Sequence, residues 1–97
     1  MTRLLFSPRA LQDAERLTAF LMESDPSAAS ETVTLLLEGL RILKQHPLIG
    51  RPAERRYREL LISRGRTGYV ALYQYLVERD SALVLAIRHQ REGGFLN

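Results

Sequence analysis

Apolar positions in the first half of the chain recur at the spacing of helices. A short apolar run at 2–6 predicts a strand, and Ser7-Pro8 directly after it predicts a helix start. A serine hydroxyl accepts from the free amides of a first turn, and proline fits the first helical position. The helix is expected to bury one stripe of side chains: Leu11, Ala14, Leu17 and Leu21.

A second helix is predicted to follow at once. Asp25-Pro26 repeats the combination of a capping residue and a proline. His46-Pro47 is expected to end this helix, because the residue before a proline avoids the helical region. Residues 8–46 are therefore predicted to form an antiparallel helical hairpin. The buried seam of its second helix is expected to consist of Ala29, Val33, Leu36, Leu40 and Leu43.

After residue 57 the repeat changes from helical to strand spacing. Runs rich in aromatic and branched side chains alternate with turns that carry glycine or charge, which is typical of an antiparallel meander. The predicted strands are 58–63, 69–77 and 82–89. The other segments are interpreted as a loop at 48–57 and turns at 64–68 and 78–81.

Two of these strands have distinct faces. The segment 69–77 is apolar on both faces, which favours a central place in the sheet. One of its faces carries three tyrosines, which we expect in the core or an interface rather than stacked on bases: Tyr69, Ala71, Tyr73, Tyr75 and Val77. Alternation along 82–89 places three side chains on a common face: Leu83, Leu85 and Ile87.

The order of elements is β-α-α-β-β-β, which predicts one α+β domain over 1–97. The three later strands form a three-stranded antiparallel meander, and the N-terminal strand completes one sheet at its edge. The helical hairpin must then cover one face of the sheet, giving a two-layer structure.

Composition narrows the function classes. The 97 residues contain no Cys, so a disulfide framework and a thiol nucleophile are excluded, and the chain shows no cluster with metal-ligand spacing. No apolar run approaches the ~18–20 residues that a membrane span needs. We expect a cytoplasmic protein that uses no metal and no cofactor.

The positive charge is concentrated in the second half. The chain carries 14 Lys+Arg against 11 Asp+Glu, and Lys44 is its single lysine. The segment 51–66 alone contains six Arg and two Glu. Such a surface suits an acidic partner, either nucleic acid or an acidic protein segment, or it is simply a solvated arginine-rich face.

One set of residues at the end of the last strand could support acid–base chemistry. His89 stands between Arg88 and Arg91, which would suit cleavage of a phosphodiester. A packed or capping histidine explains the same pattern. His46, beside Pro47, is expected at a helix terminus.

Several short motifs follow one another along the chain: Ser7-Pro8, Asp25-Pro26, Leu43-x-x-His46-Pro47-x-x-Gly50-Arg51, Arg58-Glu59-Leu60, Gly68-Tyr69-Val70, Tyr73 and Ile87-Arg88-His89-x-Arg91. Taken together in this order, they resemble the motifs of the RelE/ParE toxin superfamily, and of its ParE branch in particular. The resemblance spans nearly the whole chain, and the fold of that family agrees with the one predicted above.

The resemblance implies the toxin of a type II toxin–antitoxin module. Its partner would be a ParD-like antitoxin with an acidic C-terminal segment that folds on binding. The resemblance also implies a heterotetramer or larger complex, which contacts operator DNA only through the antitoxin. ParE-like toxins act on DNA gyrase, and so block replication, whereas RelE- and YoeB-like toxins cut messenger RNA on the ribosome.

The nuclease pattern of those branches is incomplete in this sequence. His89 matches, but Gln90 follows it where YoeB-like toxins have Tyr, and Tyr69 stands about where they have Arg. The sequence therefore favours gyrase inhibition without catalytic residues. The alternatives are a ribosome-dependent endoribonuclease, which would use Arg88, His89 and Arg91, and a non-toxic module that binds nucleic acid.

Two sets of contact residues are expected from the apolar and charge patterns. Antitoxin contacts are predicted at Leu17, Leu21, Leu40, Arg58 and Arg66. Target contacts are predicted at Arg55, Arg56, Arg64, Arg88 and Arg91.

Overall fold

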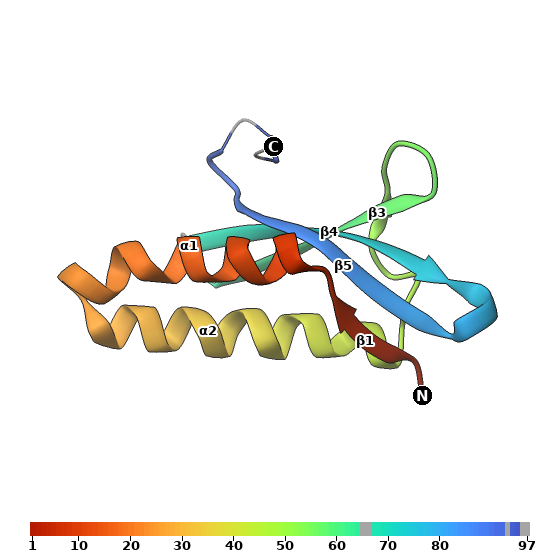
Figure 1. Ribbon diagram of the computed structural model, residues 1–97, viewed down its shortest axis with the longest axis horizontal. Helices are drawn as coiled ribbons and strands as arrows, with labels where there is room; N and C mark the ends of the chain where they lie inside the picture. Colours follow the sequence, from red (N-terminus) through yellow and green to blue (C-terminus); the bar gives the residue numbers. More distant parts are fainter. Residues whose placement is uncertain (65–66, 93, 96–97) are drawn as a thin grey trace.

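A helical hairpin lies along one face of a mixed β-sheet in the computed structural model (Figure 1). The structure describes residues 1–64, 67–92, 94 and 95. The helical elements are α1 (Pro8–Ser24), α2 (Pro26–Arg41), η1 (Ile42–Lys44) and η2 (Val77–Arg79). The strands are β1 (Arg3–Phe6), β2 (Arg51–Pro52), β3 (Tyr57–Arg64), β4 (Thr67–Leu76) and β5 (Ser81–His89).

Both predicted helix starts are confirmed. Ser7 Oγ accepts the backbone N–H of Ala10 at 3.0 Å, and Asp25 Oδ1 accepts that of Ala28 at 3.2 Å. The second helix ends earlier than predicted, because α2 stops at Arg41 and continues as the 3₁₀ turn η1. Such tightening of the last turn is common at helix ends, and it precedes the stop at Pro47.

The sheet has the order β1-β5-β4-β3-β2 within the described residues. β4 is central and the last three strands form the expected meander, with β1 parallel to β5 at one edge. The prediction of an uninterrupted loop at 48–57 is wrong, because Arg51 and Pro52 pair with β3 and Tyr57 begins β3. Two residues that include a proline give no strand periodicity, so pairing alone makes β2 a strand.

A β-bulge changes the faces of β5. Leu72 pairs with Ala86 and Tyr73 with Val84, so Leu85 has no partner opposite it on β4. The extra residue moves Ile87 into the helix-facing cluster that also holds Ala82 and Val84. The predicted common face of Leu83, Leu85 and Ile87 is therefore wrong, because a bulge breaks strict alternation.

The core lies between the helical hairpin and the helix-facing side of the sheet. Tyr69, Ala71 and Tyr73 belong to it as predicted, whereas Val77 lies in the exposed turn η2. The helices contribute the remaining buried side chains, among them Ala10, Leu36, Leu40 and Leu43. Within the described residues, no helix combines the length and the apolar character needed to cross a membrane.

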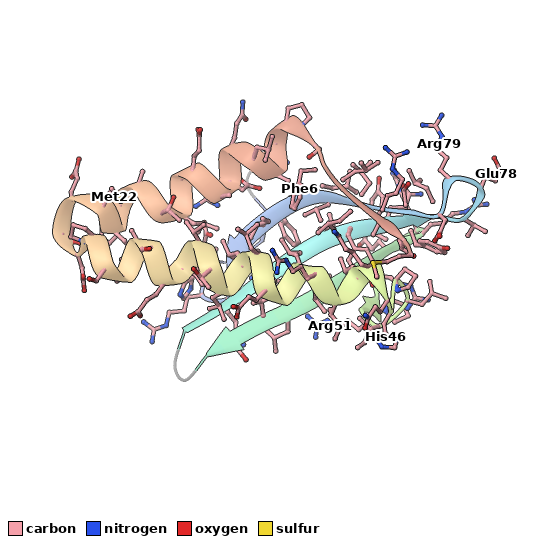
Figure 2. All side chains as sticks on the ribbon, turned by 90° about the horizontal axis from the view of Figure 1, so that it is seen from below. Phe6, Met22, His46, Arg51, Glu78 and Arg79 are labelled. Carbon is pink, nitrogen blue, oxygen red and sulfur yellow. The ribbon has the colours of Figure 1, made fainter. Side chains whose placement is uncertain are left out.

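The hairpin is longer than the part of the sheet it covers. Figure 2 looks onto the helices and shows Met22 at their connection, at the opposite end of the molecule from Glu78 and Arg79. At that end the helix connection projects past the strands (Figure 2).

Candidate functional site

Near the N-terminal end of β4, two neighbouring rows of paired residues cross β3, β4 and β5 and face opposite sides of the sheet. One row joins Ile62, Tyr69 and His89, and Tyr69 and Ile62 belong to the core beneath the helices. The next row joins Leu61, Val70 and Arg88. Because successive strand residues alternate between faces, this second row lies on the side away from the helices.

A groove of about 770 Å³ lies on the helix side of this end of the sheet. The hairpin forms its apolar wall, and the row with Tyr69 and His89 forms its floor. Its polar lining residues are Arg16, His89 and Glu92, together with Glu31 and Thr32 on α2. The apolar wall consists of Leu17, Phe20, Leu21, Ala28 and Leu35.

An ion pair joins two of the polar residues that line the groove. Arg16 donates to both carboxylate oxygens of Glu92, at 3.0 and 3.3 Å, and Glu92 Oε1 also accepts the backbone N–H of His89 at 2.8 Å. Partial burial opposes ionisation, but the His89 amide and the Arg16 guanidinium outweigh it and lower the pKa of Glu92. Glu92 therefore ties the turn after β5 to α1 as a carboxylate.

The His89 ring is held by its own turn. Its Nδ1 accepts the backbone N–H of Arg91 at 3.0 Å, and the ring meets that of Tyr69 edge-on with centroids 5.3 Å apart. As an acceptor, Nδ1 carries no proton, so the neutral ring has its proton on Nε2. His89 is thus both a turn residue and part of the groove lining.

Arg88 lies on the opposite face, at a smaller cleft of about 340 Å³. Its Nη1 donates to the carbonyls of His89, Gln90 and Glu92 at 3.3, 3.3 and 2.9 Å. The guanidinium carbon is 5.1 Å from the ring centroid of Phe95, which is a cation–π distance. The other residues that line the cleft include Ile49, Arg51, Glu59, Leu61, Val70 and Gln90.

The structure directs the side chains of Arg88 and His89, two of the candidate nuclease residues, to opposite faces of the sheet. Arg91 is exposed on the turn that follows, where its backbone N–H bonds to the His89 ring. Within the described residues, no group of three or more His, Asp or Glu could hold a metal ion.

The predicted antitoxin residues are separated by the fold. Leu17 and Leu21 line the groove, but Leu40 is only 1% exposed and cannot offer a surface contact. The helical spacing of Leu40 would suit an interface residue equally well, but its side chain packs in the core against the sheet. Arg58 Nη1 donates to the carbonyls of Leu48 and Gly50 at 3.0 and 2.8 Å, so it fastens a loop. Arg66 lies outside the described residues.

Four of the predicted target residues belong to segments on the side of the sheet away from the helices, at two separate places. Arg88 lines the cleft, while Arg55 and Arg56 are exposed in the loop before β3. Figure 1 shows that this loop and the segment after β5, which carries Arg91, both rise on the side away from the helices. The side chain of Arg64 lies outside the described part of the chain.

Sequence reasoning missed Arg16, Phe20, Glu92 and Leu61. The partners Arg16 and Glu92 are 76 positions apart, so local spacing carries no sign of their pairing. Phe20 is not one of the side chains predicted to be buried on α1. It lines the groove because the helical hairpin extends past the core. Leu61 is exposed because it alternates with the core residues Leu60 and Ile62.

Comparison with known proteins finds relatives by sequence and solved structures with the same fold. "Toxin RelE3" of Caulobacter vibrioides is 39% identical over 85 residues, which cover 88% of this chain and 90% of that toxin. "Toxin RelE1" of the same bacterium is 39% identical over 72 residues, 74% of this chain and 77% of that toxin.

Solved structures of toxin–antitoxin systems share the fold. The chromosomal ParDE system of P. aeruginosa matches with a TM-score of 0.75 at 22% identity, over 92% of this chain and 96% of that one. The intact E. coli RelBE complex matches with a TM-score of 0.64 at 19% identity, over 95% of this chain and 100% of that one. The family described as "ParE toxin of type II toxin-antitoxin system, parDE" matches residues 4–93. The chain belongs to this ParE toxin family and is the toxin of a type II toxin–antitoxin system.

Proposed function

We propose that this toxin inhibits DNA gyrase by binding it, and that it does not cut RNA. One observation carries the proposal. The cross-strand rows direct Arg88 and His89 to opposite faces, and Arg88 is engaged with backbone carbonyls. Groups that catalyse cleavage of one phosphodiester must each come within hydrogen-bond distance of that group, and side chains on opposite faces of one sheet do not.

The test is a supercoiling assay with the purified toxin and gyrase, run beside a message-cleavage assay in a translating extract. We expect loss of supercoiling, or accumulation of cleaved DNA, with intact message. Active gyrase at a large excess of toxin would refute this target.

A ribosome-dependent endoribonuclease is the second candidate, and the groove gives it a specific basis. His89 shares the groove with Arg16 and Glu92, so a base and a cation for phosphate lie on one face. The curated relatives are named RelE toxins. This function predicts message cleavage that His89→Ala abolishes, whereas the gyrase proposal predicts that the same substitution leaves inhibition of gyrase in place.

We also propose that the groove receives the antitoxin. Its apolar wall and its Arg16 suit an amphipathic segment that brings its own carboxylate. That carboxylate would compete with Glu92 for Arg16. The proposal keeps Leu17 and Leu21 as antitoxin contacts, adds Phe20 and Arg16, and omits Leu40 and Arg58.

A further inference from the structure

The face of the sheet away from the helices carries a second surface, with an apolar floor and a basic rim. Its floor is the row of Leu61 and Val70, which ends at Arg88. Leu61 is 56% exposed in the middle of a strand, although Val70 beside it is only 3% exposed. A large exposed side chain next to a cleft is a typical component of an interaction site.

Charge in the cleft favours an acidic occupant. Arg51 and Arg88 line it. Arg55 and Arg56 lie in the loop before β3, and Arg91 lies in the turn after β5; both segments are on the same side of the sheet as the cleft (Figure 1). The carboxylate of Glu59 is already paired with Arg51, with Nη2 and Oε1 3.1 Å apart. The cleft is therefore lined by two arginines and one glutamate, and Arg88 is the arginine that is not paired with Glu59.

Arg88 is prepared to receive a carboxylate. Its hydrogen bonds to the described residues all use Nη1, which fixes the plane of the guanidinium and leaves Nη2 for a partner. A guanidinium whose orientation is already fixed loses less freedom when it binds a carboxylate.

The lining of the cleft favours protein over nucleic acid. The described residues that line it are aliphatic, charged or polar, and none of them is aromatic. Bases bind to single-strand sites chiefly by stacking on aromatic rings, and the ring of Phe95 is already covered by the guanidinium of Arg88. A protein segment supplies both an apolar side chain for Leu61 and a carboxylate for Arg88.

From these observations we infer that the cleft between Leu61 and Arg88 is the surface that contacts the target, and that it binds an acidic, partly apolar protein segment of gyrase. This inference rests on the proposed function. The groove proposed for the antitoxin lies on the other side of the sheet, so the two surfaces do not overlap.

The experiment compares two exposed leucines on opposite sides of the molecule. Leu61→Glu places a negative charge in the cleft, Leu61→Lys a positive one, and Leu37→Glu makes the matched change on α2, where Leu37 is 48% exposed. Purified gyrase holoenzyme is the probe, with inhibition of supercoiling and direct binding as readouts. Circular dichroism melting curves establish that each variant is folded.

We expect Leu61→Glu to weaken binding and inhibition about tenfold or more, as loss of a central contact does. Leu61→Lys should lose less than Leu61→Glu, and Leu37→Glu should match the wild type. Equal inhibition by Leu61→Glu and the wild type overturns the inference and leaves the gyrase target standing. An inactive wild type overturns the target as well.

A separate arm tests nucleic acid as the occupant. Wild-type toxin, Leu61→Glu and Leu61→Lys are titrated with a duplex DNA fragment and a single-stranded RNA. Binding that Leu61→Glu removes and Leu61→Lys strengthens would assign the cleft to nucleic acid and overturn the inference. We expect no difference among the three proteins.

Discussion

The hydroxyl of Tyr73 accepts the backbone N–H of Gly50 at 2.9 Å and donates to the carbonyl of Pro47 at 2.8 Å. A Cβ on Gly50 would lie 2.6 Å from the Tyr73 ring and 2.9 Å from the carbonyl oxygen of Glu59. The loop between η1 and β2 is therefore fastened to the central strand by one phenol, at a position that accepts only glycine. These contacts give a physical reason for the Pro47-x-x-Gly50 spacing.

Tyr73→Phe is expected to lower the free energy of unfolding by about 1–3 kcal/mol, since it leaves a buried donor without its partner. Burial raises the pKa of Tyr73, which agrees with its protected position. Denaturant unfolding measures the loss. Tyr75→Phe is the control, because the hydroxyl of Tyr75 bonds to Asp80 at an exposed site. An equal effect of the two substitutions would contradict the prediction.

Glu92→Gln is expected to change how the free energy of unfolding depends on pH in the acid range. A carboxyl whose pKa is lowered by folding stabilises the protein above its unfolded pKa of about 4.3, and that stabilisation is lost as the pH falls through the lower folded value. The variant should be less stable than the wild type at pH 7 and closer to it at pH 3. Thermal melts across this range measure the difference, with Glu15→Gln on the exposed side of α1 as the control. A difference in melting temperature between variant and wild type that stays constant with pH would contradict this role of Glu92.

Phe20→Ala is expected to weaken antitoxin binding about tenfold or more, because a large aromatic side chain in a groove is a typical anchor. Phe20 is 78% exposed, so the fold should tolerate the change. Calorimetric titration with the antitoxin measures affinity. Met22→Ala removes a neighbouring side chain that is 57% exposed and lies outside the groove, and its affinity should stay at the wild-type level. Equal affinities of both variants and the wild type would rule out this site.

Arg58→Ala is expected to lower stability by about 1 kcal/mol, through loss of the bonds to the Leu48 and Gly50 carbonyls. Its affinity for the antitoxin should not change. Unfolding and titration of the same preparation separate the two effects. If the variant has normal stability but binds the antitoxin weakly, Arg58 is an antitoxin contact, as the charge pattern predicted.

Most of the fold follows from local signals. The caps at Ser7 and Asp25, the helical spacing behind them and the strong strand around Tyr73 each act within a few residues. The errors in the predicted strands arise where pairing between residues far apart in the sequence determines the structure. Arg51 and Pro52 become a strand only against β3, and Leu85 becomes a bulge only against β4.

The candidate site was less predictable for the same reason. Leu17 and Leu21 carry a local signal and line the groove, whereas Leu40 carries the same signal and is buried. Helical spacing identifies an apolar face but does not say whether the sheet or a partner covers it. Arg16 and Glu92 meet only through the tertiary fold.

The position of β5 has a consequence for biosynthesis. β5 is the last strand in the sequence, yet it lies between β1 and β4, and Asp13 on α1 accepts the backbone N–H of Ile87 at 2.8 Å. A nascent chain that ends before Ser81 leaves β1 without its partner and the sheet incomplete. Contacts of such sequence separation form late because their loops are costly to close. We therefore expect the sheet, and with it both surfaces described above, to form only after Ser81–His89 has been translated.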